Sequence, residues 1–252
     1  MPEPKPNFNP QPKISQQEID RINTKLDTIN NIEITHLFKP ISKILEKGIK
    51  EKIQNCEYDL LIGEDASGRI PALVFKDILQ KVYERNKKEQ PQLLFMAGTR
   101  FQSWDPDVLL KFKEHVSTHA KDKKKALVVT ELIGHGHSII SILDALQNNG
   151  ISYDIAACAQ LDNDPVHYSE EIKDHLFAGS HGKPEIFNKP ELSGVKKNYG
   201  DVLSSHANKH IPNVQLIGKA IGEKTVYDHE KINGAREDVH KLAEILFEEN
   251  FK

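Results

Sequence analysis

Four short apolar segments, separated by amphipathic ones, most strongly limit the folds open to this chain. The apolar segments are residues 58–63 (YDLLIG), 93–97 (LLFMA), 126–130 (ALVVT) and 155–161 (IAACAQL). The segments between them, residues 68–84, 105–119 and 138–149, place apolar side chains at helical spacing. Strands that alternate with helices form a parallel sheet covered on both faces, with right-handed crossovers. The sequence therefore predicts a doubly wound α/β fold.

The N-terminal part precedes this alternation and differs from it in composition. Residues 1–14 are rich in proline, which supports neither a helix nor a strand ladder, so we expect a disordered tail. Residues 15–55 predict helices, one over 16–29 with Ser15 as its N-cap and one over 40–53. We expect these N-terminal helices to pack against the main domain that follows them.

The main domain is expected to occupy residues 56–252. Its regular alternation ends inside it, because residues 162–210 are rich in Gly, Pro, His, Asn and Lys. This composition predicts an irregular, hood-like insertion with one short helix near 169–177. Residues 214–217 predict a fifth strand, and residues 231–250 predict a closing helix with an apolar stripe.

Composition excludes several classes of partner. The 252 residues carry a formal net charge of −3 with 28% charged residues, which describes an ordinary surface and does not favour nucleic acid or membrane binding. Two cysteines without a CxxC pattern indicate a reducing compartment. No apolar run reaches the length of a membrane helix. We therefore expect a cytoplasmic protein.

The turn after the third apolar segment contains Gly134, His135, Gly136, His137 and Ser138. A helix N-terminus presents N–H groups and a partial positive charge, so it attracts phosphate. The two glycines would allow close backbone approach and positive φ, Ser138 would cap the helix and bond a phosphate oxygen, and the histidines would donate further bonds. The alternative is an ordinary strand–turn–helix connection in which Ser138 is a simple cap.

Glu131 ends the strand before this turn, where a carboxylate suits sugar hydroxyls or a bound Mg²⁺. Strand and turn together resemble the phosphoribosyl-diphosphate motif of type I phosphoribosyltransferases. In that motif an apolar strand, two acidic residues and a Thr-Gly-x-Thr loop open a helix. Val128 and Val129 match the strand, Thr130 and Glu131 the acidic pair, and residues 135–138 the phosphate loop. The resemblance implies that Glu131 binds the ribose and, through the ligand, Mg²⁺, while residues 135–138 hold the 5′-phosphate.

The resemblance extends to the loops after the first and second strands. In the family, the first of these loops binds pyrophosphate, which makes Ser67, Gly68 and Arg69 candidate diphosphate contacts, and Arg100 resembles a basic residue placed nearby. An arginine fork matches phosphate oxygens well. The alternative for Arg69 is a helix N-terminal charge or a surface pair with one of the two acidic residues before it. For Arg100 the alternative is a surface arginine.

By this resemblance the chain is expected to be a phosphoribosyltransferase-like enzyme with Mg²⁺ as its cofactor. Its ligand would be phosphoribosyl diphosphate or a nucleoside monophosphate, its acceptor a nitrogenous base, and a homodimer is the favoured assembly. Three departures support a non-catalytic sensor of the same ligands as the alternative. Thr130 replaces the first acidic residue, a histidine replaces a threonine of the phosphate loop, and residues 101–125 predict a helix instead of a flexible lid. A different α/β activity, such as sugar-phosphate hydrolysis, lacks a convincing nucleophile at a strand end. The histidines within 162–210 match no metal-ligand spacing and are better explained as surface residues.

Overall fold

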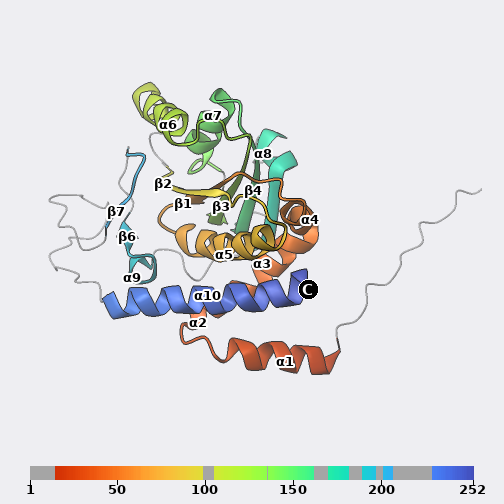
Figure 1. Cartoon of the computed structure of the whole chain (residues 1–252). Helices are drawn as coiled ribbons and strands as arrows, with labels where there is room; N and C mark the ends of the chain where they lie inside the picture. Colours follow the sequence, from red (N-terminus) through yellow and green to blue (C-terminus); the bar gives the residue numbers. More distant parts are fainter. Residues whose placement is uncertain are drawn as a thin grey trace, which may run out of the picture.

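The computed structural model describes residues 15–98, 105–134, 136–161, 170–181, 189–196, 201–206 and 229–252. Its centre is a five-stranded sheet in which every neighbouring pair is parallel, in the order β2-β1-β3-β4-β5. Helices cover both faces of this sheet (Figure 1). The fold is therefore α/β, with the layered arrangement of a doubly wound sheet.

The four predicted strands are confirmed, β1, β3 and β4 as inner strands of the sheet and β2 at one edge. They are β1 (Leu60–Glu64), β2 (Gln92–Met96), β3 (Lys125–Ile133) and β4 (Ser152–Gln160). All residues of β1 are buried, as expected for a strand covered on both faces. Strand β3 continues past the predicted end at Thr130 as far as Ile133, because residues there stay in register with β4 up to Gln160. Glu131 therefore lies within the strand and not beyond it.

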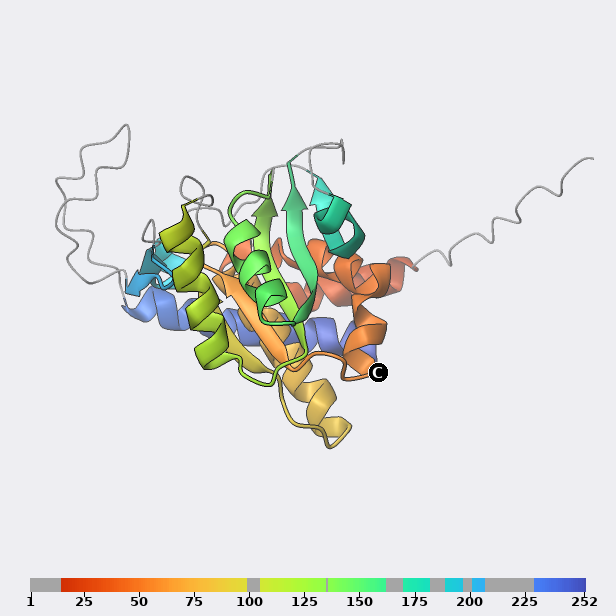
Figure 2. The same ribbon diagram turned by 90° about the horizontal axis from the view of Figure 1, so that it is seen from above.

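One face of the sheet is covered by α6 (Pro106–His119), α7 (Ile140–Asn148) and α8 (Glu170–His175). Figure 2 shows these helices side by side in front of the strands. Their apolar side chains, such as Phe112 of α6, share a core with alternate residues of the strands, among them Ile62 and Val128. We call this the α6–α7 face. Helix α6 begins where predicted, since the Asp105 side chain accepts a hydrogen bond from the Asp107 N–H as an N-cap.

The opposite face receives only one crossover helix, α5 (Arg69–Arg85), because β1 to β2 is the single connection that runs in that direction. The rest of this face is covered by helices from the two ends of the chain. They are α3 (Phe38–Ile44), the π-helical turn η1 (Leu45–Ile49), α4 (Lys50–Gln54) and the long α10 (His229–Phe251). Figure 1 shows α10 lying across α5 and α3 beneath the sheet. We call this the α5–α10 face. The N-terminal helices therefore complete the core of the α/β domain.

Helix α1 (Gln16–Leu26) is attached to α10 mainly by polar contacts, whereas α2 (Ile32–Thr35) also buries Ile34 in the core of the α5–α10 face. Ser15 caps α1 as predicted, in a capping box with Glu18. No residue of α1 is buried, and Lys25 of α1 forms ion pairs with Glu248 and Glu249 of α10. Asp238 of α10 is fully buried and accepts hydrogen bonds from the backbone N–H groups of the two residues that precede α2. The predicted tail over residues 1–14 lies outside the described residues.

The edge strand beyond β4 differs from the prediction. Its residues are β5 (Leu176–His181), which follows α8 without a loop, whereas the sequence predicted only a short helix near 169–177. The sequence Ala-Gly-Ser within β5 is typical of a turn, but a Cβ on Gly179 would lie 2.3 Å from the Pro40 carbonyl oxygen. Gly179 is therefore required by the close packing of α3 on the strand. Residues 214–217, predicted as the fifth strand, lie outside the described residues.

The remaining described part of the predicted insertion contains short elements only. They are α9 (Pro190–Ser193) and an antiparallel pair of β6 (Val195–Lys196) with β7 (Ser205–His206). Among the helices of the described ranges, none is both long enough and apolar enough to cross a membrane.

Candidate functional site

The candidate site lies where the chain reverses direction across the sheet. From β1 the chain moves to β2 on one side, and from β2 it crosses back to β3 on the other side. The carboxyl ends of β1 and β3 are thus neighbours whose following loops diverge, which is where open α/β sheets bind ligands. Here the Thr130 hydroxyl donates a hydrogen bond to Glu64 Oε2 at 3.0 Å, and both side chains are buried. This bond joins the ends of the two strands across the crevice.

The loop between β1 and α5 packs against backbone on two sides. The Gly68 N–H donates to the Glu64 carbonyl at 2.7 Å. A Cβ on Gly68 would lie 2.6 Å from the carbonyl oxygens of both Glu64 and Val129, which no side chain tolerates. Gly68 therefore allows the start of α5 to contact β1 and β3 directly. Ser67, predicted with it as a phosphate contact, is half-buried in the same loop.

Arg69 begins α5 and points back to the end of β1. Its Nε and Nη2 donate to the two carboxylate oxygens of Asp65, at 2.8 and 2.6 Å. Its guanidinium also lies over the ring of Phe95, 3.8 Å from the centroid. The sequence left open whether Arg69 contacts a diphosphate or pairs with an acidic residue before it, and in the structure Arg69 pairs with Asp65. Asp65 is buried, however, so this is an internal ion pair within the crevice and not a surface one.

The turn after β3 departs in two details from the sequence prediction. Of its two glycines, only Gly136 adopts a positive φ, of 79°, so only this one needs glycine for its backbone conformation. Ser138 was predicted to cap the following helix, but α7 begins at Ile140 and its N-cap is Ile139, which forms no side-chain cap bond. Ser138 is instead half-buried within the turn. His137 is exposed, Gly134 is half-buried, and His135 lies outside the described residues.

The end of β2 reaches this same turn. A Cβ on Gly98 would lie 1.8 Å from the carbonyl oxygen of Ser138 and 3.0 Å from Glu64 Oε1. Gly98 thus brings three strand ends into direct contact, and sequence reasoning did not assign it a role. Its signal was the glycine immediately after an apolar strand. Arg100, predicted to lie close by, is outside the described residues.

Glu131 is fully buried. Side chains alternate along a strand, so Glu131 shares the α5–α10 face with Val129, whereas Thr130 lies on the α6–α7 face. In agreement, burial raises the pKa of the Cys158 thiol in β4, and the nearby Glu131 charge raises it further. The adjacent positions of the predicted acidic pair therefore face opposite sides of the sheet. Only Thr130 bonds to the end of β1 in the contacts described.

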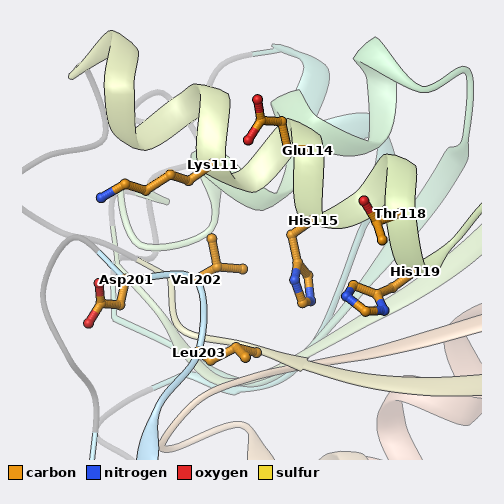
Figure 3. A pocket seen from close by; sticks show the side chains of 8 residues that line it. All are labelled: Lys111, Glu114, His115, Thr118, His119, Asp201, Val202 and Leu203. Carbon is orange, nitrogen blue, oxygen red and sulfur yellow. The ribbon is translucent and has the colours of Figure 1, made fainter.

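A separate open groove of about 500 Å³ lies between α6 and residues 201–203 (Figure 3). Its walls carry Lys111, Glu114, His115, Thr118, His119, Asp201, Val202 and Leu203. The rings of His115 and His119 point into it from successive turns of α6, with centroids 4.4 Å apart. Burial and the neighbouring His119 lower the pKa of His115. The groove adjoins the crevice where the Ala97 N–H donates to the Val202 carbonyl, but the residues that line it differ from those at the strand ends, where we place the candidate site.

The described residues contain no group of three or more His, Cys, Asp or Glu side chains arranged to hold a metal ion. Of the histidines in the predicted insertion, His181 is exposed at the end of β5. His175 lies beside Tyr153, with ring centroids 5.1 Å apart, and 3.9 Å from Asp154. These two contacts are at the amino end of β4, away from the crevice.

Comparison with known proteins identifies no family for the chain. No protein-family model matches the sequence, and no curated protein matches it significantly.

Proposed function

We propose that the chain is a phosphoribosyltransferase-like enzyme that binds phosphoribosyl diphosphate, or a nucleoside monophosphate, at the carboxyl ends of β1 and β3. One observation carries the proposal. The three loops that follow β1, β2 and β3, to which the resemblance assigns the phosphates and the ribose, lie at one edge of the sheet: Gly98 contacts the Ser138 carbonyl, and Gly68 packs on the backbone of β1 and β3 at Glu64 and Val129. A ligand with a phosphate at each end of a ribose spans two such loops.

The turn between β3 and α7 supplies the site for the 5′-phosphate. The N-terminus of α7 carries a partial positive charge, and the positive φ of Gly136 turns the backbone sharply before it. The Ser138 hydroxyl is half-buried in this turn and serves as a further donor. The donors of this site are backbone N–H groups and a hydroxyl group. They would therefore bind phosphate through hydrogen bonds, without a charged side chain.

Mg²⁺ is expected to arrive with the ligand. Glu131, to which the resemblance assigns the metal, is fully buried, while Glu64 and Asp65 are engaged by Thr130 and Arg69. These residues do not fit a resident metal cage. Mg²⁺ commonly keeps most of its ligands as water and phosphate oxygens, so a diphosphate supplies what these carboxylates do not.

A second candidate is a protein that binds the same ligands without transferring the phosphoribosyl group. Two contacts favour it. Thr130, at a position where the resemblance expects a carboxylate, donates its hydroxyl to Glu64, and the guanidinium of Arg69 is already bound to Asp65. Transfer depends on stabilising charge at the diphosphate and the ribose, so both contacts bear on chemistry more than on phosphate binding.

The two candidates separate in one set of measurements. Calorimetric titration with ribose 5-phosphate, phosphoribosyl diphosphate and nucleoside monophosphates, with and without Mg²⁺, measures binding. Release of pyrophosphate in the presence of a panel of bases measures transfer. Binding together with Mg²⁺-dependent release supports the enzyme, and binding alone supports the second candidate.

Variants locate the bound ligand. Ser138→Ala is expected to weaken ribose 5-phosphate binding about tenfold or more, since a hydrogen bond to a charged group contributes about 1.5–3 kcal/mol. Ser117→Ala removes an exposed hydroxyl from α6 and is expected to change nothing. A wild-type protein that binds none of these ligands would contradict both candidates.

A further inference from the structure

The guanidinium of Arg69 is held on two sides. Asp65 accepts both of its in-plane bonds, at 2.8 and 2.6 Å, and Phe95 covers its face at 3.8 Å. The arginine side chain retains 21% exposure, so it lies at the boundary between the crevice and the core. Its position and its orientation are therefore fixed by this chain alone, before any ligand is present.

The Asp65 carboxylate occupies the arginine fork as an anionic ligand would. Carboxylates and phosphates each present two oxygens at a spacing that a guanidinium binds bidentately. Asp65 is only 1% exposed, and burial raises the pKa of its carboxyl group while the Arg69 hydrogen bonds oppose the rise. Arg69 is therefore the main group that favours the negatively charged form of the Asp65 carboxyl group.

We propose that Asp65 is a specificity-determining residue that occupies, on Arg69, the position of a ligand's diphosphate. A diphosphate reaches the fork only by replacing the Asp65 carboxylate, whereas a 5′-phosphate binds at the separate turn before α7, where Arg69 and Asp65 take no part. Of the ligands named in the proposed function, the crevice therefore favours phosphate monoesters, such as ribose 5-phosphate and nucleoside monophosphates, over phosphoribosyl diphosphate. This inference rests on the proposed function and names the ligand class of the same site.

The neighbouring charge strengthens the selection. Glu64 precedes Asp65 and is also buried, so a diphosphate that entered beside an undisplaced Asp65 would face two carboxylates in a region of low dielectric. Like charges at such short range repel strongly. Exchange of Asp65 for the diphosphate would leave the displaced carboxylate without its arginine partner, and Glu64 would still face the ligand.

Titration of the full-length chain with inorganic pyrophosphate, without Mg²⁺, tests the inference directly. Asp65→Asn removes the competing charge and is expected to tighten pyrophosphate binding about tenfold or more, as two charge-assisted bonds become available to the ligand. Ribose 5-phosphate binding is expected to stay within about twofold, because its phosphate lies at the other loop. Asp77→Asn is the matched control, since Asp77 lies within α5 and pairs with His240 and Lys76 instead of Arg69.

Arg69→Gln provides a second and independent variant. It keeps Asp65 and removes the fork, so pyrophosphate binding is expected to fall about tenfold or more while ribose 5-phosphate binding persists. Near-ultraviolet circular dichroism verifies the fold of each variant. If Asp65→Asn does not fold, Arg69→Gln decides alone.

Failure of the inference is distinguishable from failure of the proposed function. The inference is overturned if a folded Asp65→Asn protein binds pyrophosphate no more tightly than wild type, or if Arg69→Gln binds it equally well. In either case, retained binding of ribose 5-phosphate leaves the proposed function standing. If the wild-type protein binds no ribose 5-phosphate, the proposed function fails and the inference fails with it.

Discussion

Gly68→Ala tests the close packing on which the crevice depends. The new methyl group would lie 2.6 Å from two carbonyl oxygens, Glu64 O at the end of β1 and Val129 O in β3. Neither atom belongs to a flexible side chain, because both are backbone atoms of central strands in register with each other and with their neighbours. The start of α5 must therefore move away from the sheet.

The magnitude follows from that geometry. Inserting one methyl into a well-packed interior typically costs about 1–3 kcal/mol, and contact with two rigid oxygens places Gly68→Ala toward the upper end. A chain of this length is expected to lose about 2–4 °C in melting temperature for each kcal/mol. We therefore expect a decrease in the free energy of unfolding of about 2–3 kcal/mol and a melting temperature lower by roughly 4–12 °C.

Gly234→Ala is the matched control for the same chemical change. Gly234 lies inside α10, and a Cβ there would have no heavy atom within 4 Å. Alanine in a helix interior is more favourable than glycine by about 0.5–1 kcal/mol, so this variant is expected to be more stable than wild type. Urea denaturation followed by circular dichroism measures both changes. If Gly68→Ala is as stable as wild type while Gly234→Ala gains stability, α5 does not approach the sheet as described and the reasoning is refuted.

Three further changes test the crevice and the charged groups that hold its scaffold. Gly98→Ala should displace the Ser138 turn, which it would approach to 1.8 Å, and weaken ribose 5-phosphate binding about tenfold or more in calorimetry; unchanged affinity would contradict the proposed phosphate site. Burial opposes the charge of Asp154, but the hydrogen bonds from Lys52 and the Tyr58 hydroxyl hold its pKa below the ordinary value, so its contribution is present at neutral pH and is lost as the pH falls below about 4. Asp154→Asn should therefore cost about 2 kcal/mol at pH 7 and much less at pH 3 in urea titrations, and an equal loss at both would refute this. Asp238→Asn should cost about 1.5–3 kcal/mol and increase proteolysis between α1 and α2, because the buried carboxylate accepts two backbone N–H groups there; an unchanged cleavage rate would argue against that anchor.

The sheet could be predicted from sequence because its signal is local. Each of β1, β2, β3 and β4 is a short apolar run bounded by polar or small residues, and the inner strands β1 and β4, which are buried on both faces, show no regular polar alternation. The edge strand β5 has no such signal. The Ala-Gly-Ser sequence at its centre allows close packing against α3, which lies more than a hundred residues earlier in the chain. Local sequence propensity carries no information about contacts between such distant segments.

The sequence predicted that the candidate residues lie together, but not which contacts they make. Small and charged residues follow three of the predicted strands, and because parallel strands end on one side, the structure has these segments at one edge of the sheet. The partner of Arg69 and the burial of Glu131 depend on which face each side chain takes. Strand β3 continues three residues beyond its predicted end, and this fixes Glu131 on the α5–α10 face, opposite to Thr130. A boundary shift of this size is enough to change the expected role of a carboxylate.

The shape of the crevice depends on three glycines at which the surrounding atoms leave no room for a side chain. A Cβ on Gly63 would meet Phe95 at 2.7 Å and Ala72 at 2.8 Å, and Gly68 and Gly98 exclude a Cβ by contact with backbone oxygens. These three positions bring α5, the Phe95 ring and the β3–α7 turn into contact around the ends of the strands. Phe95 in turn supports the guanidinium of Arg69, which Asp65 neutralises. Because backbone contacts fix this geometry, the crevice does not need a ligand to form, and in our proposal ligand selection depends on the Arg69–Asp65 ion pair, which an incoming anion would have to exchange.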